Sequence, residues 1–148
     1  MNLRRFTERL IQFETTDGRE AAAAAWFRSR LSELGFETYE WVADAAELAA
    51  HSSFPDDPAD IEVEDRPSVA GVLEVGDADA GPTLVLNGHL DVVPADEDVW
   101  SSPPFEPVWG ECESGETLTA RGAVDMKAPL AACVFAALDA ADDAEDAG

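Results

Sequence analysis

The residues best suited to carry chemistry form two short motifs, one around His89 and one around Asp125. His89 stands two residues before Asp91 in the sequence NGHLDVVP at residues 87–94, directly after an apolar run. Asp125 lies in the sequence GAVDMK at residues 122–127. Imidazole nitrogens and carboxylate oxygens are ligands that suit zinc and similar borderline cations. The two motifs therefore predict part of a divalent-metal site.

Asp91 is placed to orient His89. If an extended backbone persists through residues 89–91, both side chains project to one face. A zinc-bound imidazole commonly donates its other N–H to a carboxylate, which fixes the tautomer. A histidine two residues from an aspartate is also common as an incidental pair in a solvated loop, and an aspartate such as Asp125 is common at a turn or a helix start. Spacing alone leaves these alternatives open.

Three stretches of sequence, in order, resemble one known family. They are GHLDVVP at 88–94, the segment at 100–107 that ends in PFEP, and RGAVDMK at 121–127. Together they closely resemble the di-zinc amidohydrolases and exopeptidases related to acetylornithine deacetylase, succinyl-diaminopimelate desuccinylase, aminoacylase and glutamate carboxypeptidase. The resemblance covers nearly the whole chain and is weakest at 43–68. It implies that residues 1–148 are the N-terminal portion of the metallohydrolase catalytic domain.

The resemblance also implies a role for each site residue. His89 would ligate one zinc ion, Asp91 would be the catalytic residue that orients His89, and Asp125 would bridge two zinc ions, for which cobalt could substitute. Family members carry a general base and further ligands downstream, and none of these can be assigned within the 148 residues. Because proton abstraction from water needs a positioned base, we expect this fragment alone to be inactive.

The function implied by the resemblance is hydrolysis of an amide C–N bond. Deacylation of an N-acyl amino acid is the first expectation, and cleavage of a dipeptide or short peptide by an exopeptidase is the second. A hypothesis from another class is a non-catalytic truncated remnant. The expected partner is a small N-acyl amino acid or peptide substrate, with a homodimer of the full-length protein as one option.

The hydrophobic pattern predicts an α/β fold: part of a mixed sheet flanked by helices, as the resemblance to zinc-dependent exopeptidase catalytic domains also implies. Apolar residues at spacings of three and four, and residues typical of helix ends, predict three helices. Runs rich in β-branched and aromatic residues predict four strands. The helices are expected at 3–13, 21–34 and 129–138, and the strands at 36–42, 69–75, 83–86 and 117–120.

Two of these elements carry more specific predictions. Asp17 and Glu20 have the spacing of a capping box at the start of the second helix. The run TLVL at 83–86 has no polar alternation, which is typical of a strand covered on both faces, so its downstream end is the expected functional edge. The intervening segments are expected to be an irregular surface excursion at 43–68 with a short helix around Glu47, a turn rather than a calcium loop at 77–82, and an acidic linker or frayed helix end at 139–148.

Composition excludes several classes of partner. The chain has 32 acidic and 9 basic residues and a net charge of −23, so a nucleic-acid partner is not expected. Carboxylates are spread along the chain, which favours adaptation to concentrated salt that screens their repulsion.

No apolar run reaches the ~18 residues of a membrane span, and polar residues interrupt any export signal after Arg4 and Arg5, which predicts a cytoplasmic protein. Cys112 and Cys133 match no disulfide or zinc pattern.

Overall fold

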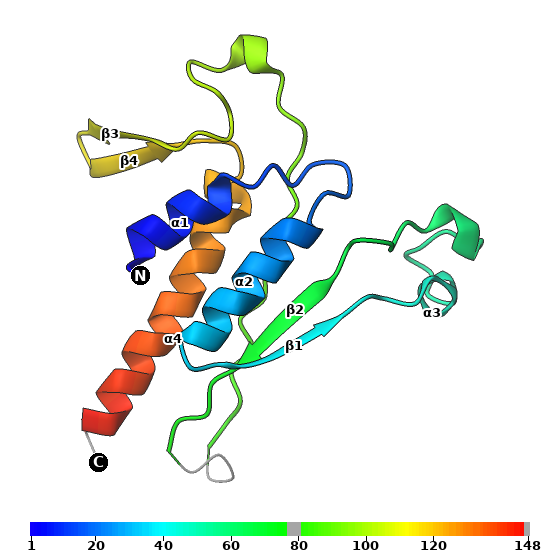
Figure 1. The fold of residues 1–148 in the computed structure, drawn as a ribbon, viewed down its shortest axis with the longest axis horizontal. Coiled ribbons are helices and arrows are strands. Elements are labelled where there is room, and N and C mark those ends of the chain that lie inside the picture. The colour runs from blue at the N-terminus through cyan, green and yellow to red at the C-terminus, as the bar shows by residue number, and fades with distance from the viewer. Residues whose placement is uncertain (77–80, 147–148) are drawn as a thin grey trace.

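Helices flank two small antiparallel sheets in the computed structural model, which describes residues 1–76 and 81–146 (Figure 1). The predicted mixed α/β fold class is confirmed. The helices are α1 (Leu3–Ile11), α2 (Ala21–Glu33), α3 (Ala45–Ala49) and α4 (Ala128–Asp146), and the strands are β1 (Glu37–Trp41), β2 (Ser68–Val72), β3 (Val108–Cys112) and β4 (Gly115–Thr119). None of the helices within these residues has the length and apolar character needed to cross a bilayer.

Each sheet is a two-stranded antiparallel pair. In the first, Glu37 of β1 lies opposite Val72 of β2, and in the second, Val108 of β3 lies opposite Thr119 of β4. Helix α2 contacts both strands of the first sheet (Figure 1). The contact is close at Gly71, where an added Cβ atom would lie 3.0 Å from a methyl group of Leu31, so the absence of a side chain lets the helix approach the strand.

The hydrophobic core joins α1, α2 and α4. Phe6 in α1 is fully buried, and its ring meets those of Trp26, Phe27 and Phe135 at centroid distances of 4.9, 5.9 and 5.6 Å. Such tilted and edge-on pairs add to the free energy gained by burying the rings. The buried cluster consists of Phe6, Leu10, Phe27, Leu31, Leu130, Ala131 and Val134. The three helices therefore share one packed core, and the segments that connect them start and end at this core.

The structure changes several predicted boundaries. The capping-box prediction is wrong: Glu20 takes the N-cap position of α2 without a side-chain hydrogen bond to the backbone. The reason is a turn at Asp17 and Gly18, whose φ angles of 52° and 81° reverse the chain before the helix starts. Helix α4 extends well beyond the predicted 138, to Asp146, and residues 147–148 of the predicted acidic end lie outside the described part.

The segment at 83–86 differs most from its prediction. It forms no strand in the described part of the chain, and Leu84 and Val85 are 80% and 78% exposed instead of covered on both faces. A sheet strand needs a neighbour for its N–H and C=O groups, and neither two-stranded sheet extends to this segment. Residues 77–80, which include most of the predicted turn, lie outside the described residues.

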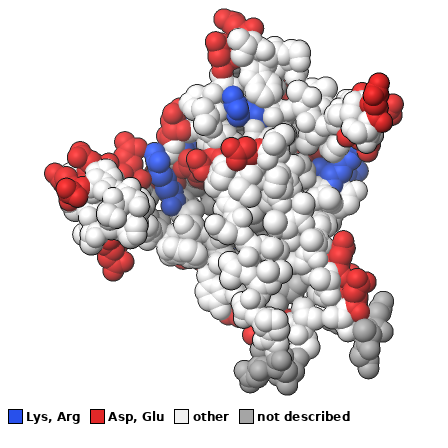
Figure 2. Space-filling view, turned by 180° about the vertical axis from the view of Figure 1, so that it is seen from behind, with Lys and Arg blue, Asp and Glu red and all other residues white. Residues whose placement is uncertain are grey.

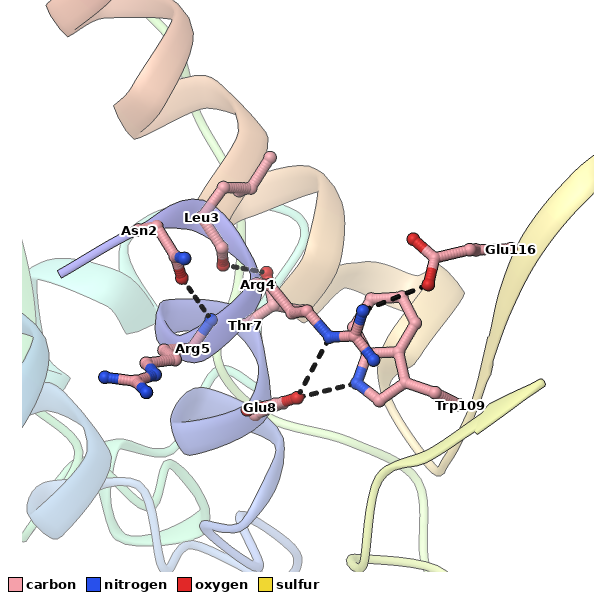
Figure 3. A network of polar contacts seen from close by, with 8 residues as sticks. All are labelled: Asn2, Leu3, Arg4, Arg5, Thr7, Glu8, Trp109 and Glu116. Carbon is pink, nitrogen blue, oxygen red and sulfur yellow. Dashed lines mark hydrogen bonds and ion pairs between the residues drawn. The ribbon is translucent and has the colours of Figure 1, made fainter. Parts of the chain in front are cut away.

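The β3–β4 hairpin, of which only β4 was predicted, is attached to α1 by one polar cluster (Figure 3). The guanidinium of Arg4 lies 4.0 Å from the centre of the Trp109 ring and 3.0 Å from a carboxylate oxygen of Glu116. The indole N–H of Trp109 donates to Glu8 at 2.7 Å. The cation–π contact between Arg4 and Trp109 and the polar contacts of these residues with Glu116 and Glu8 hold the hairpin against α1. The hairpin leads directly into the segment that contains Asp125.

Carboxylates dominate the charged surface. Figure 2 shows Asp and Glu side chains concentrated on the projecting parts of one face, around a central area that is mostly uncharged. Large apolar side chains are also exposed, including Val93, Val99 and Val124 at 72%, 76% and 86%. The segment at 43–68 contains α3 and a short 3-10 turn at Pro58–Asp60, neither of which has a buried residue. Helix α3 and the 3-10 turn therefore contribute no side chain to the packed core.

Candidate metal centre

His89 and Asp91 lie in an extended segment that follows the exposed 83–86 run. The hydroxyl of Thr15 donates to the carbonyl of Leu90 at 2.5 Å, and the N–H of Val92 donates to the carbonyl of Thr15 at 2.9 Å. These two hydrogen bonds hold the backbone on either side of Asp91. The segment is therefore fixed without being part of a sheet.

Asp125 lies in a wide turn, η3 (Ala123–Lys127), between the β3–β4 hairpin and α4. The turn starts at Gly122, whose φ angle of 76° favours glycine, and closes with a hydrogen bond of 2.8 Å from the Lys127 N–H to the Gly122 carbonyl. A Cβ atom added at Gly122 would lie 2.7 Å from a methyl group of Val92. Glycine therefore lets the turn approach the segment that contains His89.

The structure brings the three predicted site residues together. The Nε2 atom of His89 lies 2.9 Å from an oxygen of Asp125, and its Nδ1 atom lies 3.2 Å from an oxygen of Asp91 and 3.0 Å from the Asp91 carbonyl. Asp91 and Asp125 thus contact opposite nitrogens of one ring. The side chains of His89 and Asp125 are 44% and 83% exposed, so the pair opens to solvent.

Oxygen atoms lie against both ring nitrogens of His89. The Asp91 carbonyl and carboxylate are near Nδ1, and the Asp125 carboxylate is near Nε2, so either nitrogen can donate when it carries a proton. Desolvation lowers the pKa of His89, but the hydrogen bonds and charges of Asp91 and Asp125 outweigh it and raise the pKa above its usual 6.5.

The donor set fits part of a metal centre. A nitrogen and an oxygen 2.9 Å apart can serve one zinc ion, because zinc binds each donor at about 2.0–2.2 Å. Asp91 faces the other side of the ring, and within residues 1–76 and 81–146 no three His, Cys, Asp or Glu side chains converge to enclose an ion. The described residues therefore supply two candidate ligands, His89 and Asp125, and one orienting group, Asp91, and these roles stay predictions.

Two further residues lie at the site. The sequence left Lys127 either a structural contact or a role in pairing with a carboxylate or positioning a substrate anion, and it assigned no role to Thr15. Lys127 is the only lysine of the chain; it is fully buried, and its ammonium donates to the carbonyl of Phe13 at 2.6 Å. Burial lowers the pKa of Lys127 to about 8, although the charge of Asp91 acts in the opposite direction. Thr15, also fully buried, lies in the connection between α1 and α2. The only sequence feature that could have drawn attention to Lys127 is that it is the single lysine in a strongly acidic chain.

The frame presents an imidazole and a carboxylate from two separate segments, and comparisons with known proteins show which family this chain resembles. A model of peptidase family M20/M25/M40 matches residues 85–147. Succinyl-diaminopimelate desuccinylase of Leptothrix cholodnii is 36% identical over 130 residues, which cover 87% of this chain and 28% of that protein. The desuccinylase of Rhizorhabdus wittichii is 35% identical over 131 residues, or 88% of this chain and 28% of that protein.

A third relative has a different named activity. N-formyl-4-amino-5-aminomethyl-2-methylpyrimidine deformylase of Halalkalibacterium halodurans is 41% identical over 71 residues, which cover 47% of this chain and 16% of that protein. Over the residues that these matches cover, the chain is similar to proteins of peptidase family M20/M25/M40. It spans about 28% of the length of the two desuccinylases.

Proposed function

We propose that the chain supplies a metal-binding part of a zinc-dependent amidohydrolase. The observation that carries the proposal is the 2.9 Å separation between His89 Nε2 and Asp125 Oδ1, two donors that come from separate motifs. Two bound zinc ions would polarise the scissile carbonyl and activate water. His89 and Asp125 would hold these ions, with cobalt as a substitute, and Asp91 would keep the imidazole in its ligating tautomer.

Deacylation is the favoured reaction. The named activities of the three relatives described above each remove an acyl group, succinyl or formyl, from nitrogen. We therefore propose an N-acylated amino acid or similar small amide as the substrate, and cytoplasmic action, which the two free cysteines fit. Exopeptidase activity and a non-catalytic remnant are the competing hypotheses.

The substrate class is tested with the full-length product of the gene loaded with zinc or cobalt. N-succinyl, N-acetyl and N-formyl amino acids are compared with dipeptides, and hydrolysis is followed by the appearance of free amine. We expect at least one N-acyl substrate to exceed every dipeptide by about tenfold in kcat/KM, or about 1.4 kcal/mol. Faster cleavage of dipeptides would favour the exopeptidase. No hydrolysis by a metal-loaded protein would favour the remnant.

We further propose adaptation to concentrated salt, because a net charge of −23 repels itself most when screening is weak. The Debye length falls from about 10 Å at about 0.1 M to about 3 Å at about 1 M salt. The urea midpoint of unfolding is therefore expected to rise on going from dilute buffer to about 1 M KCl. Chloride is used because sulfate strengthens apolar burial in any protein. Native circular dichroism and an equal midpoint without added salt would contradict this adaptation.

A further inference from the structure

The two segments that contain His89 and Asp125 have a common support in the connection between α1 and α2. Residues 13–15 of this connection, here called the support linker, contact both segments. Thr15 bonds on both sides of Asp91 through its hydroxyl and its carbonyl, and the carbonyl of Phe13 accepts from Lys127. Lys127 closes the turn that contains Asp125.

The two side chains that make the hydrogen bonds of the support linker are buried, whereas the candidate ligands are exposed. Thr15 and Lys127 have no exposed surface, while the side chains of His89 and Asp125 are 44% and 83% exposed. Side chains on a solvent-exposed surface sample several rotamers unless their backbone is fixed. A buried hydrogen bond fixes a backbone more firmly than an exposed one, since breaking it leaves an unsatisfied polar group without water.

We propose that Thr15 and Lys127 are positioning residues that set the separation of the two metal-ligating segments, and thereby the affinity for metal. This inference rests on the proposed function. Thr15 holds the backbone of the His89 segment against the support linker through its hydrogen bond to the Leu90 carbonyl. Lys127 holds the turn that contains Asp125 against the same linker through its hydrogen bond to the Phe13 carbonyl. Neither residue touches the metal or the substrate. Each acts through the backbone of a neighbouring ligand.

The test measures metal affinity in the full-length product of the gene by competition with a chelator, together with the visible spectrum of the cobalt-loaded protein. Thr15→Val removes the hydroxyl and keeps the shape, and Lys127→Met removes the ammonium and keeps the length. We expect each to weaken affinity about 10- to 100-fold, the range for groups that orient metal ligands. The cobalt spectrum, which reports ligand geometry, should shift in both variants.

The matched control is Thr7→Val. The hydroxyl of Thr7 is also buried and donates to a carbonyl, that of Leu3 at 2.9 Å, but it lies within α1. It should lose comparable stability and keep the parental affinity and spectrum. Thr15→Ser retains the hydroxyl and should retain the affinity, which keeps the proposal testable if Thr15→Val fails to fold.

The outcomes separate this inference from the proposed function. A parent protein that binds no divalent metal overturns both. A parent that binds metal, with Thr15→Val and Lys127→Met as tight as the parent, overturns the positioning role alone. Equal loss of affinity in Thr7→Val and Thr15→Val would also overturn it, because the effect would then follow general stability.

Discussion

Replacing His89 or Asp125 by alanine is expected to remove bound metal and to reduce amide hydrolysis by more than about 100-fold, beyond the ~10–100-fold typical of groups that only orient ligands. His89→Ala deletes the imidazole nitrogen that lies 2.9 Å from Asp125 Oδ1. Asp125→Ala deletes the carboxylate that would offset the repulsion between two dications. Metal content after dialysis and initial rates of hydrolysis measure the two effects in the full-length product.

Two further variants calibrate this result. Asp91→Asn keeps the shape of the side chain but removes its charge from the Nδ1 side of His89, so it should weaken metal binding less than His89→Ala does. His51→Ala alters the other histidine, an exposed residue in the 43–68 segment whose ring accepts only from the Ser53 N–H among the described contacts. It should behave as the parent. Full metal content and activity in both His89→Ala and Asp125→Ala would show the ligand assignment to be wrong.

The proximity of His89 and Asp125 could be predicted from the sequence because each lies in a short motif, and the motifs in their order resemble one family whose members use both residues at a metal site. Gly122 supplies the positive φ angle that starts the turn, and its missing side chain makes room for Val92. The spacing of two residues lets the side chains of His89 and Asp91 contact one another. Features encoded within a few residues are the ones a sequence reveals.

The support of the site could not be predicted in the same way. Thr15 meets Leu90 across 75 positions of sequence, and Lys127 meets Phe13 across 114. Neither contact has a periodic or motif signal, because it depends on where the helices place the linker. The prediction for 83–86 was wrong for a related reason: local pattern indicates a strand, but a strand forms only when a partner pairs with its backbone.

The helix predictions succeeded where an apolar stripe decided the packing. Phe6 and Leu10 of α1 are both fully buried, as their spacing of four residues predicts. The predicted start of α2 at residue 21 is confirmed, but its capping box is wrong, because Asp17 and Gly18 can form a turn as readily as a cap and local preference did not distinguish the two. The core thus follows from the pattern of burial, whereas the ends of the elements depend on competing local hydrogen bonds.

The same core determines the second large effect, which is on stability. Phe6→Ala is expected to lower the free energy of unfolding by about 3–5 kcal/mol, the usual cost of deleting a buried aromatic ring. Phe6 has no exposed surface and contacts the rings of Trp26, Phe27 and Phe135, which belong to two other helices. Three neighbouring rings on two separate helices cannot all move to fill the space that the ring leaves.

Since a domain of ordinary stability unfolds with about 5–15 kcal/mol, Phe6→Ala should be near the limit of folding. Urea unfolding at one fixed KCl concentration measures the change. Leu3→Ala is the matched control, because Leu3 starts the same helix but is 41% exposed, and it should cost less than about 1 kcal/mol. Equal losses in the free energy of unfolding for Phe6→Ala and Leu3→Ala would contradict a core centred on Phe6. If metal affinity falls together with the free energy of unfolding, the site depends on the core formed by α1, α2 and α4.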